Sequence, residues 1–148
     1  MKKEIIKKSI LQGKFETAYE FSKYFSPDEF EDLLLGVAYD TQSITVYAFV
    51  CYLIELNDCI EYHNIAQTLM ANPLCFIEGA YVTALYHNRS ILKMNSENIN
   101  AKLMLLFYNT LPDKLVSDAE AVIAAKEILV KEPENKTALN YILKYDKQ

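Results

Sequence analysis

Residues 44–56 read ITVYAFVCYLIEL, the most apolar stretch of the chain, in which Thr45 is the single non-apolar residue up to Ile54. The stretch is hydrophobic on every side at helical spacing, which is typical of a helix that neighbouring elements cover on most sides. It falls well short of the roughly 20 residues that a helix needs to cross a bilayer. We therefore expect a buried central helix inside a globular protein.

Helix signals recur on both sides of this stretch, with short interruptions between them. Ser26, Pro27, Asp28 and Glu29 form a capping box with proline at the first helical position, and a second box runs from Ser117 to Glu120. Three glycines and four prolines are too few for many strands and tight turns, and no segment alternates with a period of two. The expected helices are residues 2–11, 14–25, 27–39, 44–56, 58–71, 74–92, 97–110, 117–131 and 134–145.

About nine helices with short connections pack as antiparallel neighbours. We predict an all-α fold of stacked antiparallel helical hairpins in a single domain, residues 1–148. Gly13 is expected to end the first helix in a left-handed conformation, and Gly36 to mark a close contact between helices. Near the C-terminus we expect an ion pair of Glu127 with Lys131 and burial of Val122, Ala125, Leu129, Ala138, Leu139 and Ile142.

The three cysteines stand in apolar, helical-looking stretches. Cys51, Cys59 and Cys75 are therefore expected to be small buried hydrophobes without disulfides, as in a reducing compartment. Lysines interrupt the apolar residues of the N-terminus before a secretory core can form. The sequence predicts a cytoplasmic protein without an export signal.

Charge is distributed unevenly, although the net charge is only −5. Residues 1–13 hold four lysines and one glutamate, a net of +3, and residues 65–148 hold nine basic and nine acidic groups. Residues 14–64 hold two basic and ten acidic groups, a net of −8. Such an acidic field repels nucleic acid and attracts a basic protein surface; the alternative is a solvated face that keeps the protein in solution.

The segment Ala119–Ile142, AEAVIAAKEILVKEPENKTALNYI, resembles the second helix of a tetratricopeptide repeat running into the next repeat. Ala121 matches the family's small position, Pro133 its terminal proline and Leu139 an apolar position. GKFETAYEFSK, residues 13–23, and Tyr86 are similar to other repeat positions, but no 34-residue period survives, Gly79 replaces a large residue and Pro112 an aromatic one. The resemblance implies degenerate helical hairpins, a TPR-like α-solenoid or a compact right-handed superhelix, with an extended surface for partners.

The central block, from ITVYAFVCYLIE through EYHNIAQTLMANPLCFIEGAYVTALYHNRSIL, resembles small bacterial helical immunity proteins of polymorphic toxin systems. The resemblance covers about a third of the chain and contains no diagnostic motif. It implies a cytoplasmic antidote that blocks the active site of one toxin, often a nuclease.

Motifs for catalysis or for metal binding are not found. Cys59 and His63 are four residues apart on an expected helix, but two ligands do not complete a zinc site. Glu61 beside His63, and His87 near Ser90, lack the partners of a catalytic arrangement, so we expect both histidines at ordinary polar helix positions. We predict no cofactor, no metal site and no enzymatic activity; an enzyme with an unfamiliar site stays open because a missing motif is weak evidence.

We predict a protein-binding immunity protein, or antitoxin, whose acidic face docks on a basic toxin domain, a nuclease, with no nucleic-acid or membrane partner. The alternative is a generic TPR-like adaptor or chaperone that binds a peptide, although the ladder of asparagine and basic residues expected for its groove is missing. Aromatic side chains dominate the energy of many interfaces, so tyrosines join the carboxylates as expected contacts. The candidate contacts are Glu16, Glu20, Tyr24, Asp28, Glu29, Glu31, Asp32, Tyr39, Asp58, Glu61 and Tyr62.

Overall fold

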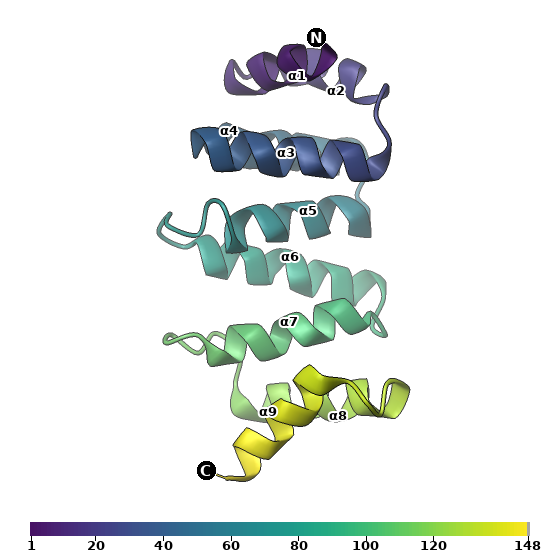
Figure 1. Cartoon of the computed structure of the whole chain (residues 1–148), viewed down its shortest axis with the longest axis vertical. Coiled ribbons are helices and arrows are strands. Elements are labelled where there is room, and N and C mark those ends of the chain that lie inside the picture. The colour runs from purple at the N-terminus through teal and green to yellow at the C-terminus, as the bar shows by residue number, and fades with distance from the viewer. Residues whose placement is uncertain (148) are drawn as a thin grey trace. The chain divides into compact units, whose positions relative to one another are not determined.

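The computed structural model describes residues 1–147 and contains nine α-helices and no strand over that range (Figure 1). The predicted all-α fold class is confirmed. The helices are α1 (Lys2–Leu11), α2 (Phe15–Ser22), α3 (Pro27–Thr41), α4 (Thr45–Leu56), α5 (Ile60–Ala71), α6 (Ala80–Met94), α7 (Ile99–Thr110), α8 (Asp118–Lys131) and α9 (Lys136–Asp146).

Seven of the nine helices begin and end within two residues of the predicted bounds. The exceptions are α2, which ends three residues early, and α6, which begins at Ala80 instead of Leu74. Gly79 has a φ of +82°, and residues 74–79 form turns in which the Ala80 N–H donates to the Ile77 carbonyl at 3.0 Å. A left-handed residue cannot continue a right-handed helix, so the prediction for residues 74–79 was wrong.

Local capping explains where α1 ends and where α3 begins. Gly13, with φ +72°, follows α1, and the N–H groups of Gly13 and Lys14 donate to the carbonyls of Ile10 at 3.0 Å and Ser9 at 2.8 Å. These two bonds are the Schellman pattern, which confirms the left-handed end predicted at Gly13. At α3, Ser26 accepts from the Glu29 N–H at 3.3 Å while Glu29 accepts from the Ser26 N–H at 2.9 Å, so the first capping box is confirmed.

The chain divides into two compact units, which we call the first unit (residues 1–87) and the second unit (residues 88–148), and each is described by itself. In the first unit α1 packs against α2 and α4 against α5. α4 buries Val46, Phe49, Val50 and Leu53, and its other residues between 45 and 54 are half-buried, as predicted for the apolar stretch. Phe49 contacts Phe15 of α2 with ring centroids 5.5 Å apart and Phe30 of α3 at 6.2 Å.

In the second unit α8 packs between α7 and α9. The face of α8 that is buried consists of Ala121, Ala124, Ala125 and Ile128, so Ala125 is buried as predicted. Val122 and Leu129 are only half-buried, because the buried stripe is rotated by one position from the predicted one. In α9, Ala138 is buried and Ile142 half-buried, whereas Leu139 is 40% exposed, so its predicted burial was wrong.

Two other expectations about small residues were wrong. Gly36 is exposed, and a Cβ built on it would meet no other atom within 4 Å, so it is not a point of close helix contact. Cys75, in the turns before α6, is exposed, and Cys51 of α4 and Cys59, the residue before α5, are only half-buried. Over residues 1–147, no helix is long and apolar enough to span a membrane.

Two of the glycines provide a stability test in which backbone conformation alone decides whether a substitution by alanine stabilises or destabilises the fold. We expect Gly36→Ala to raise the free energy of unfolding by roughly 0.5–1 kcal/mol, because alanine is favoured inside a helix. Gly13→Ala should lower it by about 1 kcal/mol, because φ is +72° there. Neither Cβ meets another atom within 4 Å, so packing does not interfere. Urea denaturation measures both, and changes of equal sign would contradict this explanation.

Candidate functional site

Eleven residues were predicted as partner contacts, and the structure places all of them in the first unit. Glu16 and Glu20 lie on α2, Asp58 precedes α5, and Glu61 and Tyr62 lie in its first turn. Glu31 and Tyr62 are half-buried, and the other nine residues are exposed. The first unit holds twelve acidic and six basic residues, a net charge of −6, whereas the second unit holds eight acidic and nine basic residues.

Several of these side chains already have local partners. Glu20 binds the Lys23 ammonium at 2.8 Å, and Glu29 belongs to the capping box, whose hydrogen bond from the Ser26 backbone lowers the pKa of this carboxyl. The Lys2 ammonium lies 3.6 Å from the centroid of the Tyr24 ring. These three residues are therefore only partly available to a partner.

A stripe along α3 is an exposed part of the predicted face in which the carboxylates have no local partners. Asp28 and Asp32 are one turn apart, and Tyr39 follows two turns later on the same side. Tyr39 is 61% exposed. Among residues 1–147, neither Asp28 nor Asp32 forms a side-chain hydrogen bond or an ion pair. We refer to Asp28, Asp32 and Tyr39 as the α3 stripe.

A groove of about 320 Å³ lies next to this stripe, between α1 and α3. Lys3 and Lys7 of α1 line it together with Glu29, Asp32 and Asp40 of α3, and the Lys7 ammonium is 3.9 Å from the Asp40 carboxylate. The basic N-terminal helix thus lies against part of the acidic segment and offsets its charge there. Sequence reasoning treated the two segments separately and missed this pairing.

The most unusual feature of the first unit is a chain of buried hydrogen bonds that sequence reasoning did not find. His63 Nε2 is 2.7 Å from Asp58 Oδ1, His63 Nδ1 is 2.8 Å from His87 Nδ1, and His87 Nε2 is 2.8 Å from the Tyr47 hydroxyl. His63 is 4% exposed and His87 is 3% exposed. The prediction that both histidines occupy ordinary polar helix positions was wrong, because the helices that carry them bring the two rings together.

The environment keeps the inner part of this chain uncharged. Burial, and secondarily the neighbouring His63, lowers the pKa of His87 to about 4. Burial, with the nearby Cys51 thiol contributing, raises the pKa of the Tyr47 hydroxyl far above the physiological range. At neutral pH, His87 is therefore neutral and Tyr47 keeps its proton.

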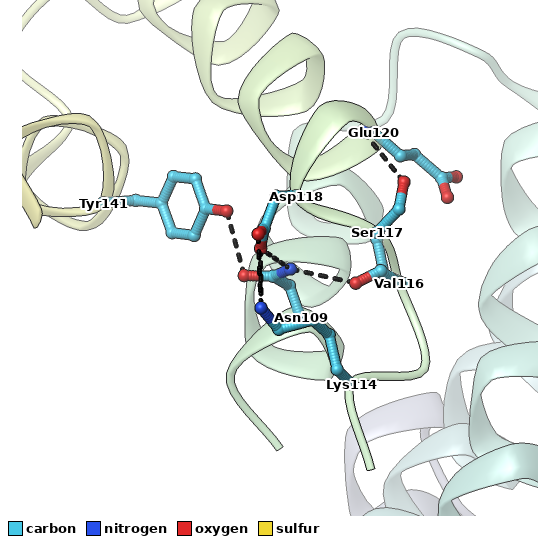
Figure 2. Close-up of polar contacts among 7 residues, drawn as sticks. All are labelled: Asn109, Lys114, Val116, Ser117, Asp118, Glu120 and Tyr141. Atoms are coloured by element: carbon cyan, nitrogen blue, oxygen red, sulfur yellow. Dashed lines mark hydrogen bonds and ion pairs between the residues drawn. The ribbon is translucent and has the colours of Figure 1, made fainter. Parts of the chain in front are cut away.

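The second unit contains a separate buried polar cluster around Asn109 (Figure 2). The Asn109 amide donates to the Val116 carbonyl at 2.9 Å and to Asp118 Oδ1 at 2.8 Å, and its oxygen accepts from the Tyr141 hydroxyl at 2.9 Å. The hydrogen bond from the Asn109 side-chain amide, followed by that from the Lys114 ammonium, lowers the pKa of the Asp118 carboxyl. The cluster connects α7, the segment before α8, and α9, and it uses both amide hydrogens and the oxygen of Asn109.

Ion pairs along α8 differ from the predicted pattern. Glu127 pairs with Lys102 of α7 at 3.0 Å, and Lys131 pairs with Glu97 at 3.6 Å, so the predicted Glu127–Lys131 pair was wrong. At the second capping box, Ser117 accepts from the Glu120 N–H at 3.2 Å, but the Glu120 carboxylate binds Arg89 through two bonds of 2.6 and 3.1 Å. Charged residues from other segments therefore take the place of the local partners that spacing suggested.

Over residues 1–147, no group of three or more His, Cys, Asp and Glu side chains is arranged to hold a metal ion. Cys59 and His63, considered as a partial metal site, are not joined by further ligands, and His63 is engaged at both ring nitrogens. The histidine chain can hold and relay a proton, and the α3 stripe can bind a cationic surface. Comparison with known proteins finds no matching family model, no matching curated protein and no matching solved structure.

The low pKa of His87 predicts an acid-sensitive contribution to stability. The unfolded chain takes up the proton near pH 6.5 and the folded chain only near pH 4, so the contribution is full above about pH 6.5 and falls as the pH drops toward 4. At pH 4.5 the loss should be roughly 2–3 kcal/mol. We expect the difference in free energy of unfolding between the wild type and His87→Gln to shrink by this amount from pH 7.5 to 4.5. A difference that stays constant with pH would contradict the buried neutral histidine.

The Asn109 cluster predicts unequal effects of two substitutions on the free energy of unfolding. Asn109→Ala should lower the free energy of unfolding by roughly 2–3 kcal/mol because it leaves several buried groups without partners, and Tyr141→Phe by about 1 kcal/mol. In the Asn109→Ala background, Tyr141→Phe should cost almost nothing, because the bond is already lost. Tyr145→Phe, on the same helix, is the control. Additive losses of stability from the two substitutions would contradict the network.

Proposed function

We propose that this protein is a bacterial immunity protein that binds a basic toxin domain, a nuclease, in the cytoplasm and neutralises it without catalysing a reaction. The observation that carries the proposal is the α3 stripe, whose two carboxylates have no ion pair among the described residues and lie on the same side of α3 as an exposed tyrosine. The net charge of −6 on the first unit supports the same partner chemistry.

The contacts of the other candidates refine the proposed surface. Glu20, Glu29 and Asp58 have local partners, so we assign them supporting roles. The primary contacts in this proposal are Glu16, Asp28, Glu31 and Asp32, with Tyr39 and Tyr62 as aromatic anchors. Tyr24, which lies under Lys2, and Glu61, which is hydrogen-bonded to Cys59, have supporting roles.

The chemistry of a nuclease cleft fits this surface. Such a cleft binds phosphates through lysine and arginine side chains, and carboxylates held on a helix can take the positions of those phosphates. Carboxylates without local partners lose no existing ion pair when they bind the cleft. Exposed tyrosines add contact area at a low entropic cost, because their side chains have few rotatable bonds.

Charge reversal on the stripe tests the proposal. The proposal expects a toxin gene beside the gene of this protein. The probe is the purified C-terminal domain of the protein that the toxin gene encodes, and the readouts are its association rate and its residual nuclease activity. Asp28→Lys with Asp32→Lys should slow association at 50 mM salt by at least about tenfold and flatten its salt dependence. At protein concentrations at which the wild type inhibits the nuclease, the double variant should leave the nuclease active.

Asp113→Lys with Glu134→Lys, on exposed positions of the second unit, changes the net charge equally and is the matched control. Its effect on the association rate should stay below about twofold, because attraction is dominated by charges near the interface. Equal slowing by both pairs would show that total charge acts instead of the stripe. Tight binding that neither pair alters would refute the acidic docking face.

A further inference from the structure

The hydrogen-bonded chain Asp58–His63–His87–Tyr47 lies entirely in the first unit and joins an exposed carboxylate to two buried rings. The Asp58 side chain is 63% exposed, whereas the side chain of His63 is 6% exposed. The direct contact between two Nδ1 atoms at 2.8 Å limits how many protons the pair can hold. The possible proton arrangements follow from the donors and acceptors available.

With both histidines neutral, the arrangement of protons is unique. Ionised Asp58 only accepts, so His63 carries its proton on Nε2 and its Nδ1 accepts. His87 then donates from Nδ1, and its Nε2 accepts from the Tyr47 hydroxyl. Each ring nitrogen of the two histidines then has a hydrogen-bond partner, and every donor of the series points toward Asp58.

One added proton preserves all three contacts. Either ring can become the imidazolium, with a single proton still shared between the two Nδ1 atoms, and in both cases His87 Nε2 carries a proton. Tyr47 then changes from donor to acceptor, and its hydrogen can turn toward the neighbouring Cys51 sulfur. The cation is most stable on His63, because the Asp58 carboxylate is 2.7 Å away.

A second proton cannot be accommodated. Both Nδ1 atoms would carry hydrogens that point at each other across 2.8 Å, and two cations would be buried side by side. The titratable groups around the pair are Asp58, Tyr47 and Cys51 of α4, and Tyr86, whose ring lies 5.2 Å from that of His87. Of these, Asp58 alone supplies a negative charge at neutral pH, so the described neighbours of the pair include no second anion to stabilise a second proton.

We propose that Asp58, His63, His87 and Tyr47 form a one-proton pH switch, in which the first proton converts Asp58 from an anion hydrogen-bonded to a neutral ring into one half of an ion pair. The second proton drives the two rings apart. The pKa of His87, about 4, places the second step in acid. The effect on a partner rests on the proposed function: mild acid removes one negative charge from the docking face and weakens attraction to a basic surface.

The test is a titration of the isolated chain from pH 8 to 4, with long-range ¹H–¹⁵N spectra that report the protonation of each imidazole nitrogen. At pH 8 we expect His63 protonated at Nε2 and His87 at Nδ1. The two rings should then change together with one midpoint and a total uptake of one proton. Below about pH 4.5 the second uptake should coincide with the loss of amide-exchange protection in α5.

Asp58→Asn should lower the first midpoint by at least about one pH unit, because the imidazolium loses its carboxylate partner. Asp28→Asn removes an equal charge from the same unit and should leave the midpoint within about 0.3 units. Tyr47→Phe removes the partner of His87 Nε2 but leaves the contact between the two Nδ1 atoms, so the two rings should still change together, as they should in Tyr52→Phe on the same helix. Two histidines that titrate independently, or a midpoint that Asp58→Asn does not move, would overturn the switch. Because no partner is present, the titration stands or fails apart from the proposed function.

Discussion

The burial of α4 is the constraint on which the first unit depends. Helices of 8–15 residues are marginal by themselves, so α1, α2 and α3 are stabilised by covering an apolar surface that α4 provides. Phe49 contacts rings of α2 and α3 on one side of α4, while Tyr47, two residues earlier and so on the opposite side, reaches His87. One helix therefore fixes both the apolar core and the end of the buried histidine chain.

Each unit combines an apolar core with one buried polar cluster, and nearly complete hydrogen bonding makes these clusters tolerable. Burying an unpaired polar group is costly, and in both clusters each donor along the described bonds meets an acceptor. Asn88 is different: its amide nitrogen donates to the Ala101 carbonyl at 2.9 Å, while its oxygen is buried without a partner among the described residues. Turning the amide would place that oxygen against a carbonyl, so the observed orientation is the better of the two.

Sequence predicted those parts of the fold that local interactions determine. The box at Ser26 and the left-handed end at Gly13 depend on neighbours in the chain, and both are confirmed. The coverage of α4 on most sides followed from its apolar composition and is confirmed too. Several failures depend on distant residues: Glu120 binds Arg89, 31 positions away, and His63 meets His87 from another helix. Of the candidate site, sequence identified acidic exposed residues, but spacing along the chain could not show that Lys3 and Lys7 face Asp32 and Asp40.

The charge of a segment therefore differs from the charge that a partner meets. Residues 14–64 carry −8, yet Glu20, Glu29, Asp40 and Asp58 each have a donor or a cation within 4 Å. Exposed ion pairs contribute little to stability, but they shorten the range over which a charge acts, because each pair is close to neutral. Attraction of a basic surface consequently concentrates on carboxylates without partners, and α3 holds two of them one turn apart. Proton uptake by His63 would add Asp58 to the neutralised set, which makes the field of the first unit a function of pH and not of sequence alone.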